Sequence, residues 1–126
     1  MLERHLQELE KEFGFAASAV DELQMRKLRL GNIEMSIKEL DPGLYFYTPL
    51  APTPQPKKEE LLTLLMKANF LGQGTGGSVI GLTEDESFLT LSLALPYEMD
   101  YKAFREAVED FVNFIDYWKG QIVKFR

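Results

Sequence analysis

His5 is the only histidine of the chain, and the chain has no cysteine. A thiol nucleophile, a disulfide framework and a cysteine-ligated metal are therefore excluded, and any histidine-based catalytic site must be built around His5. His5 lies near the start of an amphipathic segment, MLERHLQELEKE, where we expect a surface histidine without the shielding that tunes a general base. The sequence does not favour catalysis by His5.

Two short motifs resemble ligand sites at first reading. Glu84-Asp85-Glu86 lacks the ligand spacing of a calcium loop and is typical of a hairpin tip. GQGTGG, residues 72–77, follows a predicted helix and precedes a predicted strand, the reverse of a phosphate-binding loop, and no Lys-Ser or Lys-Thr pair closes it. We therefore predict no catalytic residue, no cofactor and no metal, and we favour a binding protein over an enzyme.

Composition narrows the class of protein further. The 126 residues carry 14 basic and 20 acidic side chains, a formal charge of −6, and 45% are hydrophobic. These values predict one globular domain over residues 1–126, and the acidic charge argues against nucleic-acid binding. The N-terminus lacks the apolar core of a signal peptide and no segment is apolar enough to span a membrane, so we expect a cytoplasmic protein. Residues 24–39 are locally basic, which we interpret as a solvated surface.

Hydrophobic periodicity predicts one helix and three strands in the first half of the chain. A helix over residues 2–13, which Gly14 ends, is indicated by an apolar stripe at Leu2, Leu6, Leu9 and Phe13. Alternation predicts strands at 28–30, 33–37 and 44–50, with turns at Gly31-Asn32 and Asp41-Pro42-Gly43. In the third strand Tyr45 and Tyr47 face away from Leu44 and Phe46, and either face can be the core. Because of its four prolines, we expect no regular structure across 49–56.

The second half predicts helix, strand, strand and helix. A helix from about Lys57 ends at the glycine-rich stretch, and strands follow at 78–83 and 88–95. Asp100 is a favourable N-cap for the last helix, whose apolar seam consists of Phe104, Val108, Phe111, Ile115, Trp118, Ile122 and Phe125. The order α-β-β-β-α-β-β-α, without βαβ alternation, predicts an α+β domain with helices on an antiparallel sheet.

At this point the sequence shows a family resemblance. The run LLMKANFLGQGTGGSVIGLTEDESFLTLSLALP, and FVNFIDYWKG in the last helix, resemble the class I type III secretion chaperones, the CesT/SycE-like family. The likeness is carried by Leu64, Leu65, Ala68, Asn69, Gly72, Gly74, Thr75, Gly76, Gly77 and Trp118. It is strongest over residues 61–120, and the element order extends it to the whole chain.

The resemblance implies a bacterial cytoplasmic protein that holds an extended N-terminal segment of a secreted effector without nucleotide or metal. It implies a dimer, with itself or with a related chaperone, formed largely by the middle helix: Leu61, Leu64, Leu65 and Phe70. The effector segment would press apolar side chains into surface patches and add a strand to a sheet edge. We expect its contacts at Leu6, Leu9, Phe13, Phe15, Leu30, Ile33, Met35, Tyr45 and Tyr47.

Three alternatives remain open from the sequence alone. The middle helix, which is nearly apolar, can be a buried core helix instead of an interface. A regulatory module of the same fold would bind a folded partner, such as a transcription or secretion component. A small enzyme or ligand carrier would show a deep enclosed pocket with convergent polar groups.

Overall fold

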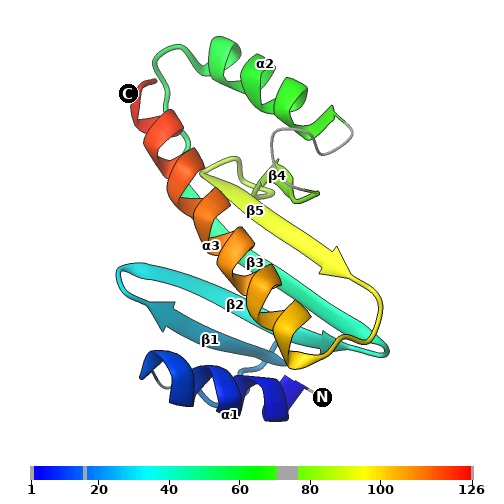
Figure 1. The fold of residues 1–126 in the computed structure, drawn as a ribbon. Coiled ribbons are helices and arrows are strands. Elements are labelled where there is room, and N and C mark those ends of the chain that lie inside the picture. Colours follow the sequence, from blue (N-terminus) through cyan, green and yellow to red (C-terminus); the bar gives the residue numbers. More distant parts are fainter. Residues whose placement is uncertain (1, 16, 71–76, 126) are drawn as a thin grey trace.

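A computed structural model describes residues 2–15, 17–70 and 77–125 of the chain. Within them the structure has three helices and five strands in the predicted order α-β-β-β-α-β-β-α (Figure 1). The elements are α1 (Leu2–Phe13), β1 (Met25–Leu30), β2 (Ile33–Leu40), β3 (Gly43–Pro52), α2 (Lys58–Asn69), β4 (Val79–Leu82), β5 (Phe88–Leu95) and α3 (Tyr101–Val123). The glycine-rich residues 72–76 lie outside the described part.

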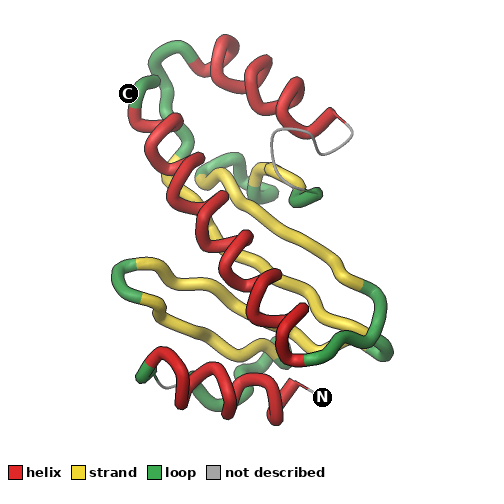
Figure 2. The backbone as a smooth tube through the Cα atoms, viewed as in Figure 1, coloured by secondary structure: helices red, strands yellow, loops and turns green. Residues whose placement is uncertain are grey.

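The five strands form one antiparallel sheet in the order β1-β2-β3-β5-β4. Helix α3 crosses the sheet diagonally, α1 lies beside β1 at one end of the sheet, and α2 lies beyond β4 at the other end (Figures 1 and 2). The predicted turn at Asp41-Pro42-Gly43 joins β2 to β3. Glycine is required there, because Gly43 has φ +110° and a Cβ would lie 2.0 Å from the backbone oxygen of Leu95.

The core lies between the sheet and the helices α1 and α3, and α2 contributes Leu61 and Leu65 to it. Phe46 of β3 is fully buried and meets Phe111 of α3 edge-on, with ring centroids 5.4 Å apart. The predicted α3 seam is buried from Phe104 to Ile122, whereas Phe125 lies beyond the end of the helix and is half-buried. Asp100 caps α3 by accepting a hydrogen bond from the backbone N–H of Ala103, as predicted.

The structure decides which face of β3 is the core face. Leu44 and Phe46 are buried, while Tyr45 and Tyr47 lie half-buried on the opposite face. The same alternation buries Met35 and Ile37 of β2. The core face of β2 and β3 therefore carries Met35, Ile37, Leu44 and Phe46, and Tyr45 and Tyr47 belong to the outer face.

The expectation of irregular structure across residues 49–56 is wrong in its first half, because β3 continues to Pro52. The pairing of β3 with β2 stops at Tyr47, whereas its pairing with β5 continues to Pro52 through a bulge between Pro49 and Ala51. Beyond Tyr47 one side of β3 has no neighbouring strand, so the missing N–H groups of proline can be accommodated there.

Both outer strands of the sheet have backbone groups that are satisfied from within the chain. On β4, the side-chain amide of Asn69 donates to the carbonyl of Ile80 and accepts from its N–H, each at 2.8 Å. On β1, Ser18 bonds the N–H and C=O of Lys27, and Asp21 bonds those of Met25, all between 2.9 and 3.0 Å. A strand added at these positions must displace these groups.

Candidate functional site

An apolar groove opens where the end of α1, the end of β1 and the middle of α3 meet. We call it the α1–α3 groove, and its volume is about 350 Å³. Its apolar walls are Leu9, Phe13, Leu30, Val108 and Val112, and its polar rim consists of Glu109 and Asn113. Phe13 is 50% exposed, which is large for the aromatic end of an amphipathic helix. The groove can take up aliphatic or aromatic side chains of another polypeptide.

The local sequence explains how the groove forms. Phe13 is the last residue of α1. The helix ends there because Gly14 adopts a left-handed conformation with φ +70°. Val108 and Val112 are four residues apart on α3 and therefore lie on one helix face. Leu30 ends β1 immediately before the Gly31-Asn32 turn. Three elements thus place an apolar side chain at one point.

A polar cluster beside the groove holds α1 against α3. Glu12 accepts hydrogen bonds from the Tyr101 hydroxyl and from Arg105, the latter at 2.9 Å. The Tyr101 hydrogen bond, followed by Arg105, lowers the pKa of Glu12. Partial burial, and then the hydrogen bond to Glu12, raises the pKa of Tyr101 to about 12. The cluster fixes the helix from which Phe13 projects.

The expectation that His5 lies on the surface is wrong. His5 is 7% exposed, its Nε2 lies 2.9 Å from the carbonyl oxygen of Met99, and its ring stacks on Phe104 at 5.2 Å. Its partner is 94 residues away in sequence, so the periodicity of α1 could not reveal the contact. His5 is part of the contact between α1 and the start of α3.

A second apolar surface surrounds α2 and β4, and we call it the α2–β4 surface. Met66 is 73% exposed and Phe70 65%, and Leu82 of β4 is also exposed. Val79 and Phe88 are exposed on the opposite face of the sheet, because Val79 is three residues from Leu82 and Phe88 adjoins buried Leu89. A hollow of about 240 Å³ between α2 and β4 is bordered by Met66, Leu82 and Leu89. The clamp from Asn69 to Ile80 fixes α2 against β4 beneath this surface. An apolar surface of this kind is typical of a protein interface.

The structure separates the residues predicted for effector binding into three groups. Those that line the α1–α3 groove are Leu9, Phe13 and Leu30. Those that are buried in the core apart from the groove are Leu6, Ile33 and Met35. Those that lie half-buried elsewhere are Phe15, Tyr45 and Tyr47, the two tyrosines being on the outer face of the sheet.

The residues predicted for a dimer interface also divide. Leu61 and Leu65 are 0% and 4% exposed and anchor α2 to its own chain, so α2 is partly a core helix. Leu64 is half-buried and Phe70 is exposed. Met66, Val79 and Leu82 are also exposed and apolar, and the sequence prediction did not include them. For Met66, an apolar residue on the far side of the α2 stripe is a signal that the sequence does carry.

The acidic hairpin tip is held by hydrogen bonds among its own residues. Asp85 accepts hydrogen bonds from Ser87 and Thr83, which lower its pKa to about 2 and explain its place in the turn. Among residues 2–15, 17–70 and 77–125, no group of three potential metal-ligating His, Asp or Glu side chains gathers. Within the same residues, no helix combines the length and apolar character needed to cross a membrane.

Two apolar surfaces on an antiparallel sheet define a protein-binding module. Its fold is similar to one in the structure of the HopA1-SchA chaperone-effector complex, with a TM-score of 0.71 and 11% sequence identity over 94% of this chain and 93% of that chain. The profile of the Tir chaperone protein (CesT) family matches residues 4–119. The chain belongs to this family, and the sequence resemblance is confirmed. A comparison with curated proteins finds no match.

Proposed function

We propose that this protein is a cytoplasmic type III secretion chaperone that binds an extended N-terminal segment of an effector and keeps it competent for export. The observation that carries the proposal is the α1–α3 groove, with Phe13 half exposed between apolar walls. Family membership supports the chaperone class. The groove is a shallow apolar depression of side-chain size, which suits single side chains of an unfolded segment.

Binding of this kind leaves a thermodynamic signature. An extended segment that becomes ordered on binding buries on the order of 1,000–3,000 Å², so the heat-capacity change is expected to be strongly negative. Because apolar contacts supply most of the affinity, binding is expected to survive moderate salt. The partner loses conformational freedom, which offsets part of the gain and keeps the complex reversible.

We also propose that the α2–β4 surface pairs with a second copy of the chain or with a related chaperone. Exposed Met66, Phe70 and Leu82 support this assignment, because large apolar side chains exposed on neighbouring elements are unfavourable in water. Light scattering after gel filtration tests it at micromolar concentration. A mass that stays near the 14.5 kDa chain value at all concentrations contradicts self-pairing. Phe70→Glu is expected to yield folded monomer.

The binding proposal is tested on the groove itself. The partner is captured from the native cell, identified by mass spectrometry and purified, and its affinity is measured for the Phe13→Ser and Val112→Asp proteins. Both changes are expected to weaken binding about tenfold or more, since each removes a buried apolar contact. Tyr97→Ser is the control, because Tyr97 is equally exposed, at 53%, and lies outside the groove.

The state of the partner separates this proposal from the other functions. NMR spectra of the labelled partner are expected to show an extended segment in the complex. A partner that stays folded and globular refutes the chaperone and favours a regulatory module of the same fold. A requirement for nucleotide also refutes it.

A further inference from the structure

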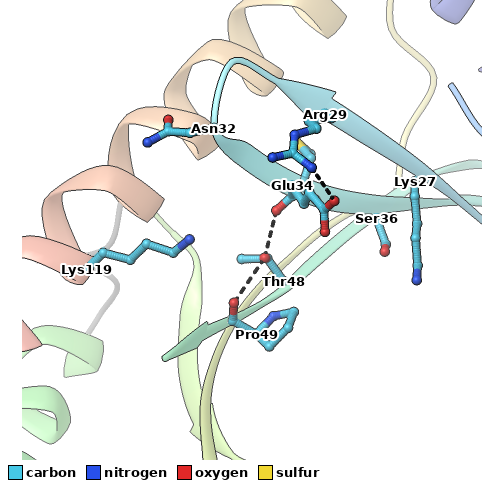
Figure 3. Close-up of a pocket in the computed structure, with 9 residues that line it drawn as sticks. Lys27, Arg29, Asn32, Glu34, Ser36, Thr48, Pro49 and Lys119 are labelled. Carbon is cyan, nitrogen blue, oxygen red and sulfur yellow. Dashed lines mark hydrogen bonds and ion pairs between the residues drawn. The ribbon is translucent and has the colours of Figure 1, made fainter. Parts of the chain in front are cut away.

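A pocket of about 390 Å³ lies between the β1–β2 hairpin, β3 and the later part of α3 (Figure 3). We call it the basic pocket, because three cationic side chains from two elements line it: Lys27 and Arg29 of β1 and Lys119 of α3. Asn32, Ser36 and Thr48 add neutral polar side chains to the lining, and Met35 and Pro49 add apolar ones. The pocket exists because β2 pairs with β3 only from Ser36 onward, so the first residues of β2 stand apart from β3.

The charge of the pocket is opposite to that of the whole chain. Among the described lining residues Glu34 is the one carboxylate, and it lies 3.4 Å from Arg29. These three cations and one anion give a formal charge of +2 in a chain of −6. Thr48 already donates to the backbone oxygen of Glu34 at 2.9 Å. Within the described residues, the side chains of Lys27 and Lys119 make no ion pair. The pocket therefore has cationic charge to offer to an anion.

The pocket and the groove share two elements. Leu30 faces the groove and its neighbour Arg29 faces the pocket, since successive side chains of a strand point to opposite faces. On α3, Val112 lies in the groove and Lys119 in the pocket, two helical turns or about 10 Å apart along the axis. An extended chain advances about 3.3 Å per residue, so roughly three to five residues span both positions.

We propose that the basic pocket binds an aspartate or glutamate side chain of the segment whose apolar side chain occupies the α1–α3 groove, about three to five residues away. This inference rests on the proposed function and adds to it a criterion for the partner. The protein would recognise a partner segment in which a carboxylate residue lies at that spacing before or after an apolar residue. The ion pair would fix the register of the segment, which the apolar contact alone does not define.

Synthetic peptides test the inference with the full chain. Each probe carries two leucines, a spacer of one to eight serines and one aspartate, and a matched series carries asparagine in its place. Affinities are measured by NMR shift titration of the ¹⁵N-labelled protein at low salt and at high salt. At the matching spacer the aspartate peptide is expected to bind about fivefold more tightly, the scale of a partly exposed ion pair. High salt is expected to remove the difference.

Charge-reversal variants locate the effect. Lys119→Glu and Lys27→Glu are expected to abolish the preference for aspartate and to leave the asparagine peptide unaffected. Lys102→Glu is the matched control, since Lys102 is an exposed lysine of α3 outside the pocket, and it is expected to keep the preference.

The outcomes separate this inference from the proposed function. If the peptides perturb the groove amides but bind equally with aspartate and asparagine, the inference is wrong and the proposed function is unaffected. A preference that is the same at every spacer length overturns the shared register. Inorganic phosphate that shifts the pocket amides as strongly as the peptide shows a free-anion site and also overturns it. If no peptide perturbs the groove, both proposals fail.

Discussion

Asn69→Ala gives a sharp test of how α2 is held to the sheet. The Asn69 side chain makes two hydrogen bonds of 2.8 Å to the N–H and C=O of Ile80, a residue that is 5% exposed. Each such hydrogen bond contributes about 1 kcal/mol net to the free energy of unfolding. A buried N–H or C=O left without a partner costs more. The variant is therefore expected to lose about 2–3 kcal/mol in the free energy of unfolding.

The assay combines urea unfolding with hydrogen exchange at a single amide. A local loss of about 2 kcal/mol corresponds to roughly 30-fold faster exchange of the Ile80 N–H if this amide exchanges by local opening. Asn113→Ala is the control, because Asn113 is an exposed helical asparagine with no such clamp. Unchanged exchange at Ile80 in the Asn69 variant would refute the reasoning.

Asn69→Asp tests whether the side chain must donate one of these two hydrogen bonds and accept the other. A carboxylate still accepts from the Ile80 N–H, but its second oxygen faces the Ile80 carbonyl, so the loss at neutral pH is expected to be at least that of the alanine variant. Protonation restores a donor. The facing carbonyl raises the pKa of this carboxyl in the folded state, so the difference from the native protein is expected to shrink as the pH falls from neutral toward about 4. A pH-independent difference contradicts the geometry of the clamp.

Three other outcomes are expected. Phe111→Ala removes a buried ring that meets Phe46 and is expected to cost about 3–5 kcal/mol in urea unfolding, a loss below about 1 kcal/mol being incompatible with a core position. His5→Ala is expected to lower stability by about 1–3 kcal/mol while leaving the partner affinity of folded protein unchanged, as measured by unfolding and calorimetry. The pKa of Asp85 lies below its ordinary 3.8, so stability from this carboxylate is present above pH 3.8 and lost as pH falls through about 2. An NMR titration midpoint of Asp85 near 3.8 contradicts that depressed pKa.

The helices and strands could be predicted because the apolar residues within each element recur with the period of that element. The α3 seam and the alternation of β2 are set by neighbours within the same element, and the structure confirms them. Contacts between distant segments could not be found in this way. The burial of His5 depends on Met99, and the continuation of β3 through Pro49 depends on where its pairing with β2 ends.

The candidate site was only partly accessible to sequence reasoning for the same reason. Leu9, Phe13 and Leu30 were predicted as effector contacts on the first helix and the first strands, and the structure brings these three to one groove. Val108 and Val112 complete it from α3, about 100 residues further along, and no period of the sequence connects them to α1. The clamp of Asn69 on Ile80 also has no sequence signal, because a polar residue at the end of a helix is common.

The engaged edges of the sheet have a consequence for how such a protein behaves in a crowded cell. Unpaired strand edges are templates for edge-to-edge stacking, and a chaperone that gathers unfolded chains concentrates material able to stack on them. Here Asn69 on β4, and Ser18 and Asp21 on β1, engage backbone groups at which such stacking would begin. At these positions the backbone groups of the edge strands are already hydrogen-bonded within the chain. Stacking of another strand on these edges is therefore expected to be less favourable than on edges with free backbone groups.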